Sequence, residues 1–390
     1  MSGSTRSAEF ARRFAAAGHE VHVVTSSRGD RPIAESWVVT EEEGYSVHWS
    51  WVPYNNSMSH AQRVWAFAKF AILAGMRAGK LGGDVVFATS TPLTIAIPGA
   101  YAAWRRRCPM VLEVRDLWPE LPIAIGALRS PASRAAARLL ESWAYRRAAH
   151  VVALSPGMAE GVISQGVSRD RVSVIPNACD ITLFASDAST RASIRGRYEW
   201  LAGRPLVLYA GTLGKLNGVG YLARIAHVVR NRAPHVQFAV IGDGAERDKI
   251  RSLAADLGVL DNNFHMMPSI GKRDIAGWFA SADLVCSLVV DLPQMWMNSA
   301  NKFFDGIAAG KPVAINYLGW QADMLSSNRA GLILPPAEPE AAGRIIADAC
   351  SDCAGLAVMG EAARELAIRE FDRDKLSRKL LDVLEGVVQS

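Results

Sequence analysis

Apolar and polar positions alternate along the whole chain with two different periodicities. Short apolar runs of strand length are separated by longer stretches whose apolar residues recur at helical spacing, which is typical of parallel sheets wound by helices. The predicted strands are Glu20–Thr25, Tyr45–Val52, Asp84–Thr89, Met110–Arg115, His150–Leu154, Val172–Pro176, Leu206–Ala210, Val236–Ile241, Phe264–Met267, Leu284–Val289, Val313–Asn316 and Gly331–Leu334. The predicted helices are Ser7–Ala17, Ala61–Lys80, Thr94–Arg106, Pro131–Ala148, Pro156–Gln165, Gly218–Arg232, Ala245–Leu257, Lys272–Ala280, Lys302–Ala309, Pro339–Ala349 and Arg373–Val388.

This α/β pattern stops and restarts once, which predicts two domains. A chain of 390 residues exceeds one ordinary core, and the polar, strand-poor stretch 185–204 reads as the linker. We therefore expect an N-terminal domain at 1–188 and a C-terminal domain at 205–370. The last helix, 373–390, has a leucine stripe and is expected to pack back onto the first domain.

The first domain lacks the strand with which a Rossmann-like domain normally opens. Residues 1–6 run directly into the helix Ser7–Ala17, and Gly3 resembles the tail of a glycine-rich loop. That strand is central in a doubly wound sheet, so its loss leaves hydrogen-bonding groups open on two neighbours. We hypothesise that the start site is misassigned or the chain is truncated, which the upstream DNA, read in frame, would test.

Composition narrows the classes of function. Half of the residues are hydrophobic, yet prolines and polar residues interrupt the most apolar stretch, Val85–Trp104, so no membrane span is predicted. The polar N-terminus lacks a signal peptide, and we expect a cytoplasmic protein. The net charge of +5 comes without interleaved cations and aromatics, which argues against nucleic acid and is compatible with phosphates or an anionic membrane. Cys350 and Cys353 read as small residues on a late helix rather than a metal or redox site.

Two glycine-containing loops follow neighbouring strands of the second domain. Gly211 and Gly214 separate a strand from a helix, where backbone N–H groups can approach a phosphate and Lys215 can add a cation. The alternative is that these glycines only permit a tight turn. The matching loop with Gly242 on the next strand favours phosphate binding.

Several motifs occur in a fixed order along nearly the whole chain. They are G-H-E-V at 18–21, I-P-N-A-C-D at 175–180 followed by Phe184, Y-A-G-T-L-G-K at 209–215, I-G-D-G at 241–244 and D-G-I-A-A-G-K-P-V at 305–313. At these spacings they resemble the motifs of glycosyltransferase family 4. The run E-V-R-D-L-W-P-E at 113–120 is similar to one in the O-antigen and capsule enzymes of that family, including N-acetylfucosaminyltransferases.

The resemblance implies a GT-B fold, with two Rossmann-like domains facing a cleft and the donor nucleotide on the second. It implies that Asp305 binds the ribose and that Asp116, Lys215 and Asp305 form the catalytic set. The family glutamate eight residues before Asp305 is replaced here by Met297, which puts donor-sugar recognition in question. The full set of expected donor-binding residues is Gly3, Gly211, Gly214, Lys215, Gly242, Met267, Pro268, Ser299, Ala300, Asn301, Lys302 and Asp305.

The expected function is retaining transfer of a sugar, from a UDP-sugar donor, to a lipid-linked or polysaccharide acceptor in cell-surface glycan synthesis. No metal or other cofactor is expected, and substitution of Lys215 by Ala is predicted to abolish most transfer. The alternatives are a GT-B epimerase of UDP-N-acetylglucosamine and a catalytically inactive GT-B scaffold. A dehydrogenase is disfavoured because no full G-x-G-x-x-G with its later acid is present.

The pattern of helix 61–80 suggests a membrane surface as a further partner. Arg63, Lys69, Arg77 and Lys80 fall within about a third of its circumference, and aromatic residues occupy much of the rest. Such a helix can lie on a membrane and bring the enzyme to a lipid-linked acceptor at the inner face of the cell membrane. The alternative is a core helix with a solvated basic edge.

Overall fold

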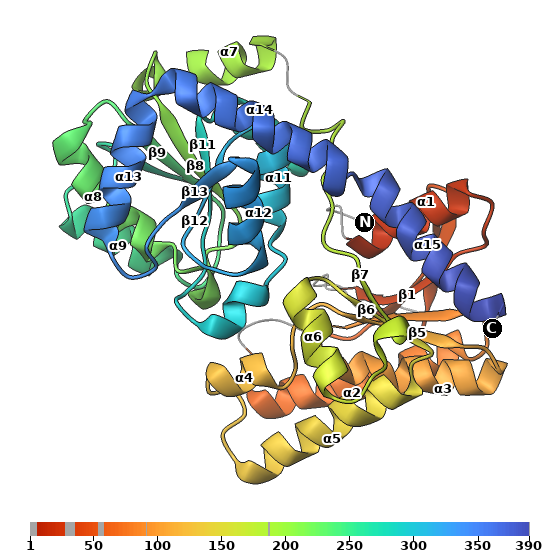
Figure 1. Ribbon diagram of the computed structural model, residues 1–390. Helices are drawn as coiled ribbons and strands as arrows, with labels where there is room; N and C mark the ends of the chain where they lie inside the picture. Colours follow the sequence, from red (N-terminus) through yellow and green to blue (C-terminus); the bar gives the residue numbers. More distant parts are fainter. Residues whose placement is uncertain (1–5, 28–35, 54–57, 91, 186–187, 390) are drawn as a thin grey trace. The chain divides into compact units, whose positions relative to one another are not determined.

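The computed structural model describes residues 6–27, 36–53, 58–90, 92–185 and 188–389. The chain forms two compact units, one of residues 1–176 and 374–390 and the other of residues 177–373 (Figure 1). The boundary therefore lies before the stretch 185–204 that was expected to be the linker. That stretch contains α7 (Ala188–Gly196), where Ile194 packs closely against Gly277 of the second unit. The segment is polar overall, but the apolar side chain of Ile194 packs in the second unit, so the segment belongs to that unit and is not a linker.

The first unit divides its strands between two sheets. One has the order β1-β3-β2 and the other the order β4-β5-β6-β7. The elements are α1 (Arg6–Ala16), β1 (His22–Ser27), β2 (Val38–Glu42), β3 (Tyr45–Trp51), α2 (His60–Ala78), β4 (Val86–Thr89), η1 (Leu93–Ile95), α3 (Ala96–Arg106), β5 (Met110–Val114), α4 (Glu120–Ala124), α5 (Pro131–Arg147), β6 (His150–Ala153), α6 (Pro156–Ser164), η2 (Arg169–Arg171), β7 (Val172–Val174) and α15 (Arg373–Gln389).

The two sheets are separate because no strand among the described residues pairs with both β1 and β4. Strands β1 and β4 each pair with one neighbour, β3 and β5 respectively, and no strand precedes α1 among the described residues. Gly3 lies outside the described residues. The sequence pattern missed β2, which pairs antiparallel with β3 and carries no clear apolar alternation because half of it faces solvent.

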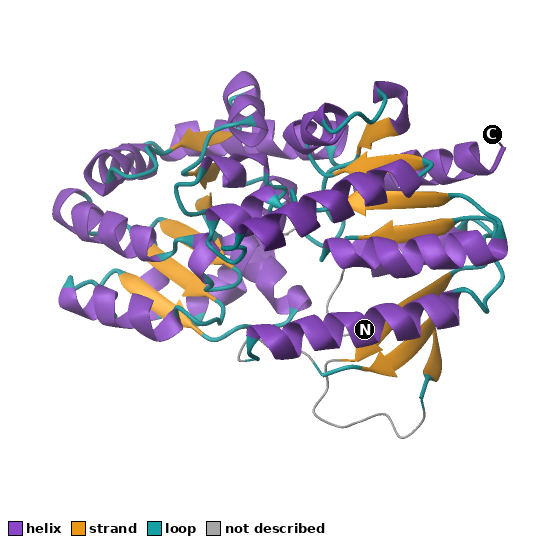
Figure 2. Ribbon diagram, turned by 90° about the horizontal axis from the view of Figure 1, so that it is seen from below, coloured by secondary structure: helices purple, strands orange, loops and turns teal. Residues whose placement is uncertain are grey.

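Three helices of the first unit, α2, α5 and α6, begin at a serine cap. Ser59 and Gln62 form a reciprocal capping box at the start of α2. Ser130 caps α5 directly before Pro131, and Pro is favourable at the first helical position. Helices α2, α3 and α5 lie side by side (Figures 1 and 2). None of the helices in the described part of the chain is long and apolar enough to cross a membrane.

The second unit is built on one six-stranded parallel sheet. Its order is β10-β9-β8-β11-β12-β13, so the first strand in sequence, β8, lies in the interior. The elements are α7, η3 (Glu199–Leu201), β8 (Leu206–Ala210), η4 (Lys215–Asn217), α8 (Gly220–Arg232), β9 (Gln237–Ile241), α9 (Arg247–Asp256), β10 (Phe264–Met267), α10 (Lys272–Ser281), β11 (Leu284–Ser287), η5 (Pro293–Met297), α11 (Asn301–Ala308), β12 (Val313–Ile315), α12 (Trp320–Asn328), β13 (Gly331–Ile333), α13 (Pro339–Ser351) and α14 (Cys353–Glu370).

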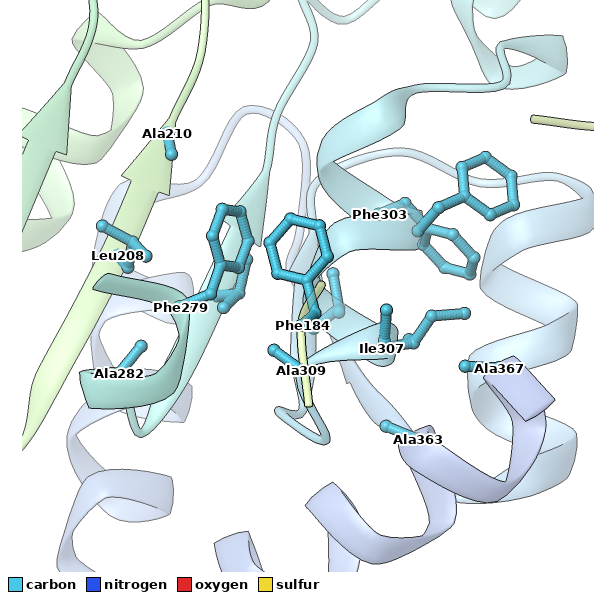
Figure 3. Close-up of a cluster of buried hydrophobic side chains, with 14 of the residues drawn as sticks. Phe184, Leu208, Ala210, Phe279, Ala282, Phe303, Ile307, Ala309, Ala363 and Ala367 are labelled. Carbon is cyan, nitrogen blue, oxygen red and sulfur yellow. The ribbon is translucent and has the colours of Figure 1, made fainter. Parts of the chain in front are cut away.

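An apolar core anchors α11, the helix that matters most for the site. Phe303 and Phe304 are fully buried and contact each other edge to face, with ring centroids 5.2 Å apart. Figure 3 shows Phe303 and Ile307 of α11 among side chains from β8, α10 and α14. Burial of one face of this short helix fixes the direction in which its N-terminus and its polar residues point.

Candidate functional site

The sheet of the second unit has a single point at which the strand order reverses. Strand β8 pairs with β9 on one side and with β11 on the other. In open parallel sheets, ligands bind at the carboxyl ends of the strands beside this reversal. The segments that follow β8 and β11 carry most of the predicted donor-binding residues.

The two glycine loops pack against each other, backbone to backbone. A Cβ atom placed on Gly242 would lie only 1.9 Å from the carbonyl oxygen of Gly211, and the φ of Gly242 is 156°. The N–H of Gly211 donates to Ile241 (2.9 Å), and that of Leu213 donates to Asp243 (2.8 Å). Close loop packing therefore explains Gly242, and these amides are already hydrogen-bonded.

Lys302 brings a cation to the first glycine loop. Its Nζ lies 3.4 Å from the position that a Cβ would take on Gly211 and 5.3 Å from the centre of the Tyr209 ring. Burial lowers the pKa of Lys302 to about 8, and the nearby carboxylate of Asp305 opposes that shift. A partly desolvated ammonium at a glycine loop is suited to an anionic ligand.

Lys215 lies in a different place. It is exposed and lines a pocket of about 280 Å³ together with Arg224, Glu246 and Lys249, whereas Lys302 is not among the lining residues. The motif at 209–215 resembles the family pattern Y-x-G-x-L-x-x-x-K/R, and the cationic position of that pattern, counted from Tyr209, falls on Asn217. The side-chain oxygen of Asn217 accepts the N–H of Gly214 at 3.3 Å. The geometry thus places Lys302, rather than Lys215, beside Gly211.

The start of α11 presents unused donors. Ala300 is the N-cap residue, and its own N–H donates to the side chain of Asn298 at 3.0 Å. Among the described residues, the N–H groups of Asn301 and Lys302 have no hydrogen-bond partner. The first amides of a helix and its dipole attract negative charge, so this end of α11 suits a phosphate.

Asp305 lies one turn into the same helix, within a group of charged side chains. Burial raises its pKa to about 6, against the opposing effects of Lys272 and Arg373. Lys272 also forms an ion pair with Asp180 at 3.7 Å. A carboxylate one turn from a helix N-terminus that binds a phosphate can accept hydrogen bonds from the ribose hydroxyls of the same nucleotide.

The predicted base-binding residues follow β10. The carbonyl oxygen of Met267 accepts hydrogen bonds from the N–H of Gly242 (3.3 Å) and from Arg247 (3.1 Å). Met267 is partly buried beside the core that also holds α11, and Pro268 follows it directly. The end of β10 is thereby tied to the second glycine loop.

The first unit carries the remaining predicted residue, Asp116, just beyond β5. Asp116 is partly exposed, and the peptide bond between Trp118 and Pro119 is cis. Arg115 donates its backbone N–H to the hydroxyl of Ser90 at 3.1 Å. This hydrogen bond ties the start of the loop after β5 to the end of the neighbouring strand β4.

Sequence reasoning missed a buried ion pair in this unit. Arg6 Nε lies 2.7 Å from Glu113, and both side chains are almost completely buried. Glu113 also accepts from Thr89 at 2.7 Å, and Arg6 donates to the carbonyl oxygen of Ile175 at 2.7 Å. A glutamate inside the apolar strand β5 was the available signal, because a fully buried acid requires a partner.

No group of three or more His, Cys, Asp or Glu side chains suited to a metal ion occurs within the described ranges. Cys350 is buried and Cys353 is exposed, and both are free thiols.

Comparisons with known proteins match both halves of the chain. Residues 3–178 match the model of the Glycosyl transferase 4-like domain, and residues 204–352 match the model of Glycosyl transferases group 1. A GDP-mannose-dependent alpha-(1-6)-phosphatidylinositol monomannoside mannosyltransferase from Mycolicibacterium smegmatis is 25% identical over 309 residues, 77% of this chain and 76% of that protein. A D-inositol 3-phosphate glycosyltransferase from Paenarthrobacter aurescens is 27% identical over 49% of this chain and 46% of its own length.

Solved structures share the fold at lower identity. Anabaena HepE in complex with UDP superposes with a TM-score of 0.68 and 19% identity, over 88% of this chain and 86% of that one. Sucrose-phosphate synthase from Thermosynechococcus elongatus gives a TM-score of 0.78 and 17% identity, over 98% and 92%.

Proposed function

We propose that this chain, a glycosyltransferase of the GT-B fold that joins a Glycosyl transferase 4-like domain to a group 1 domain, transfers a sugar from a UDP-sugar with retention of configuration. One observation carries the donor side of the proposal: Lys302 beside Gly211, at the start of a helix whose first amides are free, with Asp305 one turn further on. These groups match a diphosphate followed by a ribose.

UDP is the first candidate nucleotide, because HepE has been solved in complex with UDP and with UDP-glucose. The phosphatidylinositol monomannoside mannosyltransferases are described as GDP-mannose-dependent, so GDP is the second. The Met267–Pro268 end of β10 is the proposed place for the base, and the residues there determine which nucleotide is accepted.

In the proposed reaction, the acceptor hydroxyl attacks the anomeric carbon on the face from which the diphosphate leaves. The bond between the anomeric carbon and the phosphate oxygen breaks, and the leaving phosphate takes the acceptor proton. The charge that develops on the diphosphate is stabilised by Lys302 and the amides of α11. Lys215 is a further candidate cation, and Asp116 is the proposed polar group on the acceptor side.

The proposed acceptor is a lipid-linked or polysaccharide glycan at the cytoplasmic face of the cell membrane, where the enzyme acts as a peripheral protein. The surface of α2 and α3 supports this. Trp65 on α2 and Trp104 on α3 are 72% and 71% exposed, and the two helices touch where Tyr101 contacts Gly75. Further apolar side chains exposed on these helices are Val64, Ile72, Met76 and Ile97.

One of the four basic residues expected together on one side of helix 61–80 is not directed to solvent in the structure. Arg77 turns inward and donates to His48, which is buried (2.9 and 3.1 Å). Lys69, Lys80 and Arg105 remain exposed. An apolar surface fringed by cations fits the interface of an anionic bilayer. Sedimentation with phosphatidylglycerol vesicles tests this: substitution of Trp65 and Trp104 by Ser should release the protein, and unchanged binding would refute it.

The direct test of the proposed function is a donor screen. The purified chain is incubated with UDP-, GDP- and dTDP-sugars, with and without acceptor lipid extract, and nucleoside diphosphate release is measured. We expect release from one donor class. Interconversion of UDP-N-acetylglucosamine without an acceptor would instead identify an epimerase, and failure to bind any of these nucleotides would identify an inactive scaffold.

A further inference from the structure

A short segment at the start of the second unit is hydrogen-bonded to the loop that leads into α11. The backbone N–H of Asn177 donates to the hydroxyl oxygen of Ser299 at 3.0 Å. The side-chain Nδ2 of Asn177 donates to the carbonyl oxygen of the same serine at 2.6 Å. Asn177 is 7% exposed and Ser299 is partly buried, so both bonds are partly shielded from water.

The segment contacts α11 at a second point and is itself held from the other side. The thiol of Cys179 donates to the carbonyl oxygen of Phe304 at 3.1 Å. The N–H of Cys179 donates to Phe371 at 2.7 Å, and the N–H of Arg373 donates to Cys179 at 3.2 Å. The segment that carries Asn177 is therefore hydrogen-bonded on both sides, to α11 and to residues 371–373.

We propose that Asn177 is a positioning residue for the donor diphosphate: it orients Ser299 so that the hydroxyl and the free amides at the start of α11 face the phosphate. The inference rests on the proposed function. The hydroxyl oxygen of Ser299 accepts the Asn177 N–H, which leaves its own proton to donate to a phosphate oxygen. The bond from Nδ2 occupies the Ser299 carbonyl, which would otherwise be free to turn toward the phosphate and repel it.

Two substitutions separate positioning from general stability. Asn177→Ala removes the Nδ2 donor, and Asn177→Asp keeps the size of the side chain but replaces the donor by a carboxylate oxygen that repels the Ser299 carbonyl. Asn263→Ala is the matched control. Asn263 is fully buried in the same unit, and its Nδ2 also donates to a backbone carbonyl, that of Ala226, at 3.0 Å. It precedes β10, at the opposite edge of the sheet from the strand ends that lead into the site.

The measurement is the Kd for UDP and for GDP by calorimetry, at a temperature below the melting transition of every variant. We expect Asn177→Ala to weaken binding by about tenfold and Asn177→Asp by more, because a partly buried hydrogen bond and its geometry are lost. Asn263→Ala should lower the melting temperature and leave the Kd unchanged. Ser299→Ala combined with Asn177→Ala should be clearly less than additive, because Asn177 is proposed to act by orienting the hydroxyl that Ser299→Ala removes.

The outcomes distinguish this inference from the proposed function. If the wild-type chain binds neither UDP nor GDP, the proposed donor site is wrong. If the wild type binds and both Asn177 variants bind equally well, the positioning role is wrong while the donor site stands. An equal loss of affinity in Asn263→Ala would also overturn the positioning role, since it would show a general effect of lost stability.

Discussion

Substitution of Lys302 by Met gives the sharpest test of the donor site. Methionine keeps most of the aliphatic stem, which packs at Gly211, and removes only the charge. A hydrogen bond to a charged partner contributes about 1.5–3 kcal/mol. A full charge pair at about 4 Å sets an upper bound of about 4 kcal/mol at an effective dielectric constant of about 20. We therefore expect the donor kcat/KM to fall by about 10- to 150-fold.

Two comparisons keep the result interpretable. Lys215→Met removes a charge from the exposed pocket and should have the smaller effect on kcat/KM, the opposite of the ranking expected from sequence alone. Thermal melting should show no loss of stability for Lys302→Met, because burial of the ammonium already lowers the pKa of Lys302. Near-normal kcat/KM for Lys302→Met, or a larger loss for Lys215→Met, would refute the assignment of the diphosphate to α11.

Further predictions concern pH, packing and metal. The profile of kcat/KM against pH should fall below about 6, where Asp305 becomes protonated, and above about 8, where free Lys302 loses its charge; Asp305→Asn should lose the acid limb. Gly242→Ala should destabilise the second unit by about 2 kcal/mol or more in urea melts, because its Cβ would overlap the Gly211 carbonyl. Glu113→Gln should cost about 3–5 kcal/mol of unfolding free energy by leaving the Arg6 charge buried without its partner. Removal of divalent metal with EDTA should leave transfer unchanged.

The sequence predicted the framework of the fold well because the strands of the second unit are buried on both faces. Runs such as Leu206–Ala210 and Gln237–Ile241 are continuously buried in the structure, and such runs read clearly as parallel strands. Strand β2 was missed because it is half exposed and contains Thr40, Glu41 and Glu42. It pairs with β3 as a hairpin closed by Glu43 and Gly44, whose positive φ values of 46° and 90° suit a two-residue turn, so Gly44 was the available local signal.

The candidate site was predictable in its outline and not in its details. Glycine and acid positions follow local rules, so Gly211 and Asp305 could be named from loops and helix starts. Which of two lysines lies beside Gly211 depends on the register of α11 against β8, and that register is set by the burial of Phe303 and Phe304. Asn177 lies far from Ser299 in sequence, so their contact could not be read from either segment alone.

The domain boundary illustrates the same limit. The stretch 185–204 is polar and looks like a linker, but Ile194 packs in the second unit and Leu201 is fully buried there. The actual boundary at Pro176 and Asn177 falls inside a motif that gives no compositional signal. Composition identifies a linker only where a segment makes few packing contacts, and here a few apolar residues suffice to override it.

The most direct test of the central claim is a crystal structure of this chain with the nucleoside diphosphate that the donor screen identifies. We expect the diphosphate to lie within hydrogen-bond distance of Lys302 Nζ and the first amides of α11, with the ribose hydroxyls on Asp305. A diphosphate bound instead in the pocket of Lys215, Arg224 and Lys249, with α11 unoccupied, would contradict it.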